Sequence, residues 1–303
     1  MKILLTGGTG FLGSHLITKL LELDHSILVV DNLSLGKKEF LPSSKDKLQF
    51  EECDITKKQR LEAVLETFKP EVIIHLAAIH YIPYCNEYPF KTLKTNVVGT
   101  RNLLEICFEA PPEIFFFSST AAVYPIRDIA NREDSETSPT DIYGISKLIG
   151  EDLVHLYHLK TGVRAIIGRL FNMYGPNPTN PHLIPEIIKQ IQSNQRTLKL
   201  GNLEAKRDFI YVKDVADAII NLINSNVEFG IFNIGTGLEY SGNEIIHFIQ
   251  EILSEKIEII QDKNKLRKSD RMHLLANIDK IKNYTNWSPQ WNLKDGLKEL
   301  LEQ

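Results

Sequence analysis

This chain of 303 residues has no long apolar run, no surplus of one charge and few cysteines. Its 35 Lys and Arg residues stand against 39 Asp and Glu residues, a net charge of −4 without a long block of either sign, which argues against nucleic acid or an anionic membrane as a partner. No apolar run approaches the roughly 20 residues that a membrane-spanning helix requires, and residues 1–6 lead into glycines without the pattern of a signal peptide. We therefore expect a cytoplasmic protein whose partner is a diffusible small molecule, with no nucleic acid and no membrane.

The three cysteines also exclude two kinds of site. Cys53, Cys85 and Cys107 are odd in number and far apart, and no nearby Cys or His stands at metal-ligand spacing. We predict no disulfide framework and no metal site, and we interpret the cysteines as buried or incidental thiols.

The hydrophobic residues, 43% of the chain, follow the pattern of a globular α/β protein. In the first half, short apolar runs alternate with amphipathic stretches, such as the one that carries Leu12, Leu16 and Leu20. Strands that alternate with helices predict a doubly wound parallel sheet with helices on both faces. The expected strands are residues 3–6, 27–30, 48–51, 72–76, 114–118 and 165–170.

The sequence pattern changes from about Asn172. Residues 174–178, with two prolines and a glycine, predict an irregular connection, after which helical stretches mix with short strands. Residues 231–234 form another strand-like run, so we expect the chain to return to the first sheet before it ends. The predicted domains are residues 1–170 with roughly 210–236, and a second, smaller mixed α/β domain of residues 171–209 with roughly 237–303.

A glycine-rich turn follows the first strand and opens the first helix, with glycines at Gly7, Gly10 and Gly13. Such a trio provides a tight turn, room for a pyrophosphate beside bare backbone, and close packing of helix on strand. Glycine turns of this kind also occur without a ligand. Asp31, at the end of the second strand, favours the cofactor interpretation, because a carboxylate there can accept both ribose hydroxyls and would repel the 2′-phosphate of NADP. The pattern therefore predicts NAD as the cofactor, and Asp54, after the third strand, is either an adenine contact or a solvated loop residue.

Tyr143 and Lys147 lie one helical turn apart, a rise of about 6 Å. To act as a base near neutral pH, the phenol must lose roughly 3 pKa units, about 4 kcal/mol. One ammonium at about 5 Å supplies roughly 3 kcal/mol, and the charge of an oxidised nicotinamide would supply the rest. We therefore expect a lowered Tyr143 pKa in the loaded site, and an exposed Tyr with a solvated Lys is the alternative.

Ser118, Ser119 and Thr120 end a predicted strand at the carboxyl edge of the sheet, where ligands of open α/β folds bind. A hydroxyl at this edge can hydrogen-bond a substrate oxygen and the phenol together. Ser and Thr at strand ends are also ordinary turn residues, which is the alternative interpretation.

Together these motifs resemble the extended short-chain dehydrogenase/reductase family, in its branch of NAD-dependent nucleotide-sugar epimerases and dehydratases. The resemblance covers nearly the whole chain, and it implies a Rossmann-type first domain that binds NAD and a second domain that binds the nucleotide sugar. It also implies that Thr120, Tyr143 and Lys147 are catalytic. The further segments that carry it are residues 75–78, 96–100, 169–176, 206–212 and 267–270.

The resemblance assigns two sets of binding residues, one for NAD and one for the nucleotide sugar. The alternative role for the arginines is a surface salt bridge. The alternative role for the aromatic residues near position 80 is packing within their loop. The residues implied to bind NAD are Gly7, Gly10, Phe11, Leu12, Gly13, Asp31, Asn32, Ser34, Asp54, Ile55, Leu76, Ala77, Ala78, Asn96, Ser118, Tyr143, Lys147 and Leu170. The residues implied to bind the nucleotide sugar are His80, Thr120, Asn172, His182, Leu183, Lys199, Arg207 and Arg267.

Departures from the family pattern narrow the reaction. Hexose 4,6-dehydratases of this family carry Asp-Glu directly after the catalytic Thr, where this chain has Ala121 and Ala122, so the acid and base of that elimination are missing. Leu274 matches a position that gates the C2 substituent, and it neither admits nor excludes N-acetylated sugars. We predict NAD-dependent 4-epimerisation of a nucleotide-diphosphate hexose, first of all a UDP-hexose, through a transient 4-keto intermediate.

Two alternatives remain beside this prediction. One is another 4-keto-forming enzyme, namely a dehydratase, a decarboxylase or a 4-ketosugar reductase. The other is a dinucleotide-binding regulator that has lost its chemistry, which the complete set of Thr120, Tyr143 and Lys147 disfavours. The resemblance also implies a homodimer, paired through helices at residues 93–108 and 143–159.

Overall fold

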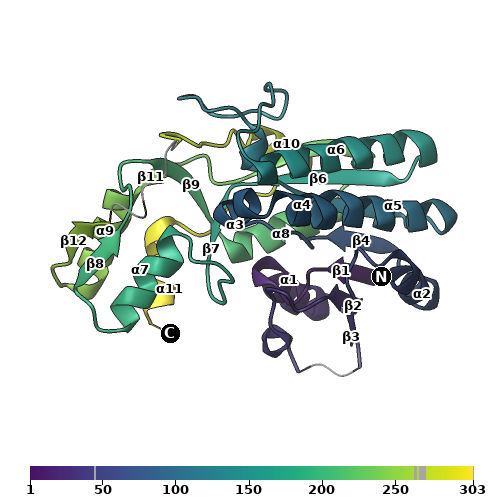
Figure 1. Cartoon of the computed structure of the whole chain (residues 1–303), viewed down its shortest axis with the longest axis horizontal. Helices are drawn as coiled ribbons and strands as arrows, with labels where there is room; N and C mark the ends of the chain where they lie inside the picture. Colours follow the sequence, from purple (N-terminus) through teal and green to yellow (C-terminus); the bar gives the residue numbers. More distant parts are fainter. Residues whose placement is uncertain (44–45, 263–264, 266–270, 303) are drawn as a thin grey trace.

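The chain forms a central parallel sheet with helices on both faces, and a smaller part built on two short sheets (Figure 1). The computed structural model describes residues 1–43, 46–262, 265 and 271–302. The strand order of the central sheet is β10-β6-β5-β4-β1-β2-β3, and every neighbouring pair is parallel, which confirms the predicted α/β fold. Its strands are β1 (Lys2–Thr6), β2 (Ser26–Asp31), β3 (Leu48–Glu52), β4 (Val72–His75), β5 (Ile114–Thr120), β6 (Arg164–Leu170) and β10 (Phe229–Ile234).

The central strand β5 shows why these residues form a buried sheet. All seven of its residues are buried, because helices cover both faces. Successive side chains point to opposite faces, so that Phe116 packs in one hydrophobic cluster while Phe115 and Phe117 pack in the other. The strand continues to Thr120, which pairs with Leu170 of β6. The predicted end at residue 118 was therefore wrong, because polar side chains at a strand end resemble a turn in sequence.

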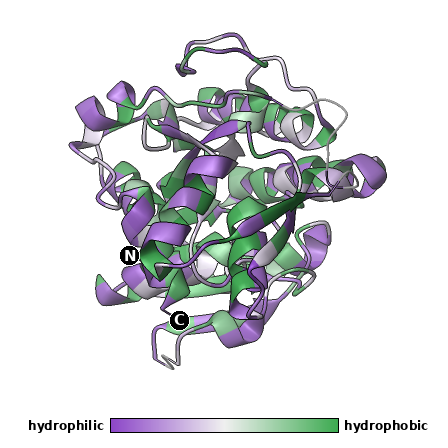
Figure 2. Ribbon diagram, turned by 90° about the vertical axis from the view of Figure 1, so that its left-hand side faces the viewer, coloured by the Kyte–Doolittle hydropathy of each residue, from purple (hydrophilic) through white to green (hydrophobic). Residues whose placement is uncertain are grey.

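Two layers of helices enclose this sheet. Their apolar faces point inward, and Figure 2 shows hydrophobic residues gathered where helices and strands face one another. On one face lie α1 (Phe11–Glu22), α8 (Val212–Ile223) and α10 (Asp279–Thr285). On the other face lie α2 (Lys58–Phe68), α5 (Gly99–Glu109) and α6 (Ile142–Thr161). Shorter elements are η1 (Lys38–Phe40), α3 (Ile82–Glu87), α4 (Pro89–Leu93), the π-helical η2 (Lys94–Val98) and η3 (Ala121–Val123).

The smaller part has a hydrophobic cluster of its own, which includes Ile187, Leu198 and Leu297. A three-stranded sheet lies beside the central sheet, and a two-stranded parallel sheet lies farther out. The first consists of β7 (Asn172–Tyr174), β9 (Lys206–Tyr211) and β11 (Glu239–Ser241). The second consists of β8 (Thr197–Leu200) and β12 (Glu258–Gln261), with α7 (Leu183–Gln192), α9 (Gly242–Leu253) and α11 (Leu293–Leu301) around them.

Strand β10 returns to the edge of the central sheet beside β6, as the run at residues 231–234 predicted. We retain the division into residues 1–170 with 210–236 and residues 171–209 with 237–303 as a proposal. Cys53, Cys85 and Cys107 are free and buried, in agreement with their interpretation as buried thiols. Among the helices that the described residues form, none combines the length and apolar character needed to cross a bilayer.

Candidate functional site

The glycine-rich turn packs closely against its neighbours, and side chains cannot occupy two of its positions. Gly7 has a φ of +74°, and a Cβ there would stand 2.7 Å from the backbone nitrogen of Ala77. A Cβ at Gly13 would stand 2.5 Å from the Cα of Gly8, so helix α1 packs directly on the turn. Gly10 is the N-cap of α1 and lacks a side-chain cap, which leaves the first N–H groups of α1, from Phe11 onward, facing outward.

Asp31 stands at the last position of β2 and orders the loop beside this turn. Its carboxylate accepts the backbone N–H of Thr9 at 3.1 Å and that of Leu33 at 2.9 Å. The hydroxyl of Thr9 is buried without a hydrogen-bond partner among the described residues. The Asp31 carboxylate at the end of the second strand, with the unsatisfied Thr9 hydroxyl of the glycine-rich turn beside it, fits the ribose of a dinucleotide.

A second group of predicted cofactor residues lies next to Asp31. The Asn32 side chain donates to the carboxylate of Asp54 at 3.1 Å and accepts the N–H of Ser34 at 3.1 Å. Although burial opposes it, hydrogen bonds from Thr56 and Asn32 hold the pKa of Asp54 below its ordinary value. Asp54 is therefore an ionised acceptor within the loops at the ends of β2 and β3, where the adenosine half would lie.

A buried hydrogen-bond chain fixes the loop of Leu76, Ala77 and Ala78 after β4. The Ala77 N–H bonds the hydroxyl of Thr6 at 3.3 Å, and that hydroxyl bonds Nδ1 of His75 at 2.6 Å. Nε2 of His75 bonds the hydroxyl of Thr100 at 2.9 Å, which donates to the carbonyl of Asn96. Burial, and next the charge of Lys147, lower the pKa of His75 to about 3, so the ring is neutral and serves as a structural link.

The side chain of Asn96 joins this loop to helix α6. Its amide oxygen accepts the N–H of Ile79 at 2.8 Å, and its amide nitrogen donates to the Ile79 carbonyl and to the Ser146 hydroxyl, each at 2.9 Å. Ser146 in turn donates to the carbonyl of Tyr143 at 2.7 Å. Both amide hydrogens of Asn96 are thus used within the chain, and the predicted contact between Asn96 and NAD stays a prediction.

Thr120, Tyr143 and Lys147 come together between the carboxyl end of β5 and the first turns of α6. Helix α6 begins here because the Asp141 carboxylate caps it, accepting the Gly144 N–H at 2.8 Å. The phenol of Tyr143 lies beside the Thr120 hydroxyl, and this contact favours the ionised form of the phenol. One turn later the ammonium of Lys147, with 2% of its surface exposed, lies 4.5 Å from the centre of the Phe117 ring.

Burial dominates the protonation of this trio. It raises the pKa of Tyr143 above its ordinary value of 10, and the contact with the Thr120 hydroxyl only partly opposes this rise. Burial also lowers the pKa of Lys147 to about 7, against the charge of Glu151. The lowered Tyr143 pKa that we expect in the site loaded with NAD stays a prediction, because in the chain without cofactor desolvation of the phenol outweighs its contact with Thr120.

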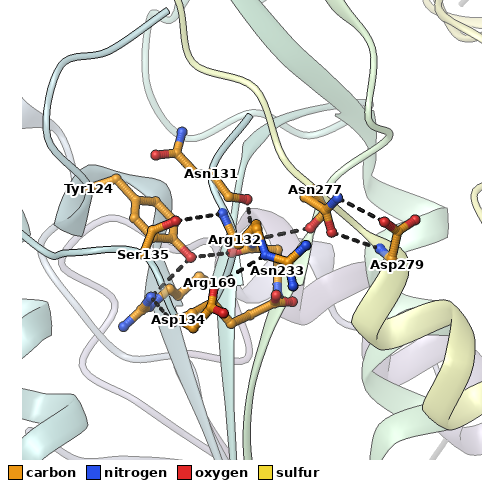
Figure 3. Close-up of polar contacts among 10 residues, drawn as sticks. Tyr124, Asn131, Arg132, Asp134, Ser135, Arg169, Asn233, Asn277 and Asp279 are labelled. Atoms are coloured by element: carbon orange, nitrogen blue, oxygen red, sulfur yellow. Dashed lines mark hydrogen bonds and ion pairs between the residues drawn. The ribbon is translucent and has the colours of Figure 1, made fainter. Parts of the chain in front are cut away.

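Sequence reasoning missed a buried ion pair under the catalytic residues. Arg169 and Glu151 are bonded through two atom pairs, at 2.7 and 2.9 Å, and the Ser119 hydroxyl donates to the same carboxylate. Figure 3 shows Arg169 directed toward Tyr124 and Asn233, and its guanidinium donates to the Tyr124 phenol at 3.0 Å. No local pattern in the sequence indicates this pair, because Arg169 on β6 and Glu151 on α6 are 18 residues apart.

The loop after β4 meets the loop before α7 at a pair of histidines. The rings of His80 and His182 stack at 6.1 Å, and the amide of Asn180 donates to Nε2 of His80 at 2.9 Å. Burial, followed by the neighbouring His182 and Lys147, lowers the pKa of His80 to about 4. The structure thus brings together His80, His182 and the adjacent Leu183 from distant parts of the sequence, and it adds Asn180.

The predicted diphosphate residues have different placements. Asn172 begins β7 and pairs with Phe209 of β9, two residues from Arg207. The Arg207 guanidinium donates to the carbonyls of Lys206 and Arg271 at 2.8 and 2.6 Å.

Two further residues predicted to bind the substrate are Lys199 and Arg267. Lys199 is exposed on β8, at the far end of the molecule from α6 in Figure 1. Arg267 lies outside the described residues, so its predicted role stays a prediction.

The chain is similar to known proteins over nearly its whole length. A model of the NAD dependent epimerase/dehydratase family matches residues 3–235. The chain is 35% identical to a putative UDP-glucose 4-epimerase of Methanocaldococcus jannaschii, over 99% of this chain and 97% of that protein. It is 30% identical to the dTDP-D-glucose 4,6-dehydratase of Mus musculus, over 99% and 88% of the two chains. A crystal structure of a UDP-glucose 4-epimerase with UDP-glucose from Thermotoga maritima superimposes with a TM-score of 0.92 and 30% identity, covering 100% of this chain and 98% of that one.

Proposed function

Because the chain belongs to the NAD-dependent epimerase/dehydratase family, we propose that it catalyses the 4-epimerisation of a nucleotide-diphosphate hexose, first of all a UDP-hexose. The observation that carries the proposal is the half-buried Tyr143 phenol, which lies beside the Thr120 hydroxyl and one helical turn from the buried Lys147. The epimerases among its relatives and structural neighbours support it.

The cofactor site fits NAD by its residues. Gly7 and Gly13 keep the turn free of side chains, the start of α1 offers its N–H groups to the pyrophosphate, and the Asp31 carboxylate disfavours a 2′-phosphate. When bound, NAD supplies a reversible hydride acceptor for oxidation at C4 and return to the other face of the 4-keto sugar. Leu76, Ala77 and Leu170, at the carboxyl ends of β4 and β6, would face the nicotinamide half.

Tyr143 and Thr120 perform the proton transfer in this proposal. Tyr143 removes the proton of the C4 hydroxyl as the sugar is oxidised and returns it when the sugar is reduced. The Thr120 hydroxyl holds the phenol and the substrate oxygen in line. In the empty protein burial raises the Tyr143 pKa, so positive charge brought by the cofactor and a protonated Lys147 are needed to form the phenolate.

The remaining candidates would hold the nucleotide sugar. Arg207 and Asn172, on the adjacent strands β9 and β7, are placed to bind the diphosphate. His80 and His182, with Leu183, would border the sugar where the two loops meet. We keep Lys199 and Arg267 as proposed substrate residues on the resemblance alone.

The alternative 4,6-dehydratase reaction is disfavoured by two buried alanines. Ala121 and Ala122 form η3 directly after Thr120 and carry no acid or base. Relatives with dehydratase activity are nevertheless close in identity, so loss of water, or of CO₂, is measured as a separate outcome below.

A homodimer is the proposed assembly, because one face of α5 and α6 exposes large apolar side chains. Residues at helical spacing along α6 include Ile145, Ile149, Leu156 and Leu159, the last with 66% of its surface exposed. Phe108 of α5 is exposed beside them. A second copy of the same face would cover them by forming a four-helix bundle.

Proton NMR of the sugar tests the reaction directly. The purified protein is incubated without added cofactor with UDP-glucose, UDP-galactose, their N-acetyl forms or UDP-glucuronate, while absorbance of reduced nicotinamide is recorded. We expect interconversion at C4 without net NADH. Loss of water or CO₂ would identify the alternative chemistry, and no turnover of any sugar would contradict the proposal.

The substitution Tyr143→Phe tests the assigned base. It removes the phenol without changing the ring, so we expect turnover to fall at least about a hundredfold while NAD remains bound. Tyr284→Phe is the matched control, because that tyrosine is 61% exposed on α10. Full activity of the Tyr143 variant would overturn the assignment.

A further inference from the structure

Arg271 places a guanidinium next to the catalytic residues from the opposite side of the site. Its Nη2 donates to the carbonyl of Ala122 at 3.1 Å and to the hydroxyl of Thr140 at 3.2 Å. Ala122 follows Thr120 by two residues, and Thr140 precedes Tyr143 by three. The cation is therefore fixed between the two chain segments that position the proposed base and its partner.

The guanidinium of Arg271 is only partly satisfied. Its Nη1 is buried and has no hydrogen-bond partner among the described residues. Within the same residues, no carboxylate lies within ion-pair distance of it; the charge of Asp141 acts over a longer distance, and that carboxylate caps α6. Burial lowers the pKa of Arg271. This direction is typical of a buried cation whose loss of hydration is not fully offset by opposite charge or hydrogen bonds. Such a cation binds an anionic ligand more favourably than it binds a neutral one. A carboxylate suits it best, because its two oxygens are acceptors for the planar guanidinium.

The position of the cation decides which anion of a nucleotide sugar could reach it. In a 4-epimerisation, C4 lies against Tyr143, while the diphosphate leaves from C1 on the far side of the ring. The substituent on C5 is adjacent to C4. The Arg271 carbonyl lies at Arg207, the proposed diphosphate residue, whereas the Arg271 guanidinium reaches the segment after Thr120, where a charged group at C6 would come close to it. Ala121 and Ala122 add no negative charge that would repel such a group.

We propose that Arg271 selects a sugar with a carboxylate at C6, so that the substrate is a nucleotide-linked hexuronate. The inference rests on the 4-epimerisation proposed above and specifies its substrate class. Arg271 would bind the carboxylate through Nη1 while Nη2 keeps its contacts with Ala122 and Thr140.

Ligand binding and turnover together test this assignment. Binding of UDP-glucuronate, UDP-glucose and UDP is measured by calorimetry, and KM is measured for the two sugars, with wild-type protein and with Arg271→Gln. We expect wild-type protein to prefer UDP-glucuronate roughly tenfold or more, and the variant to lose that preference while its affinity for UDP-glucose and UDP changes little. Arg271→Lys keeps the charge without the fork and should restore part of the preference.

Other results would overturn the proposal in recognisable ways. Equal weakening of all three ligands, UDP included, would assign Arg271 to the diphosphate or to folding. Equal wild-type affinity for both sugars would exclude a carboxylate site. If no sugar is turned over but the Arg271-dependent preference in binding persists, the proposed reaction fails and the anion site stands. Arg132→Gln, whose side chain is 64% exposed, is the control for the loss of an arginine.

Discussion

Arg169 and Glu151 form a two-point ion pair in the interior, with Nη2 2.7 Å from Oε2 and each side chain 4% exposed. We expect Arg169→Met to lower the free energy of unfolding by about 3 to 5 kcal/mol, because it leaves a buried carboxylate without its cation. Urea denaturation measures the change. Arg132→Met removes an exposed pair with Asp134 and should cost less than about 1 kcal/mol. A similar small loss in the Arg169 variant would show that the buried pair is dispensable.

The buried ammonium of Lys147 should make stability depend on pH. Its pKa is about 7 in the folded chain and 10.5 ordinarily, so between these values the unfolded chain binds more protons. Stability therefore rises with pH across this window, and the cost of burying the charge is fully present below about pH 7. We expect Lys147→Met to flatten the dependence between about pH 7 and 9.

Thermal denaturation of cofactor-free protein at several pH values measures this effect of Lys147. The difference between wild-type protein and the variant isolates one group from the others that titrate. Lys298→Met, at a side chain that is 61% exposed, should leave the slope unchanged. Parallel curves for wild-type protein and the Lys147 variant would contradict a lowered pKa.

The turn at Gly7 should tolerate no side chain. Gly7→Ala would place a methyl group 2.7 Å from the backbone of Ala77 and hold an L-residue at a φ of +74°. We expect loss of bound NAD, measured by absorbance of the released nucleotide. We also expect the free energy of unfolding to fall by more than the backbone strain at positive φ alone would cause. Gly162→Ala is a matched control, since its φ is +72° but nothing lies within 4 Å. That variant should lose only about 1 kcal/mol and keep its NAD. NAD retained in full by the Gly7 variant would contradict the proposed cradle.

The apolar face of α5 and α6 should hold two chains together. Leu156→Asp introduces a charge into this face, at a side chain that is 47% exposed in one chain. We expect sedimentation velocity to show a dimer for wild-type protein and a monomer for the variant, because burying the unpaired charge is costly. Leu238→Asp, at 59% exposure before β11, should remain dimeric. A wild-type monomer at micromolar concentration would refute the assembly.

The elements of the fold could be predicted because their signals are local. Strand and helix periodicity, the glycines of residues 7–13 and the one-turn spacing of Tyr143 and Lys147 depend on neighbours in sequence. Asp31 was correctly expected at the end of β2 for the same reason. The end of β5 was misplaced, because pairing with Leu170 decides it and that residue is distant in sequence.

The sequence by itself determined the parallel sheet, and it indicated the glycine turn and the candidate trio of Thr120, Tyr143 and Lys147. The tertiary structure alone decided the contacts between distant segments: His80 against His182, Arg169 against Glu151, and Arg271 beside Ala122. It also decided the electrostatics, since burial raises the Tyr143 pKa in the chain without cofactor, an effect that the spacing of Tyr143 and Lys147 does not reveal. The physical reason is that desolvation depends on everything packed around a group, whereas spacing along one helix fixes only a single neighbour.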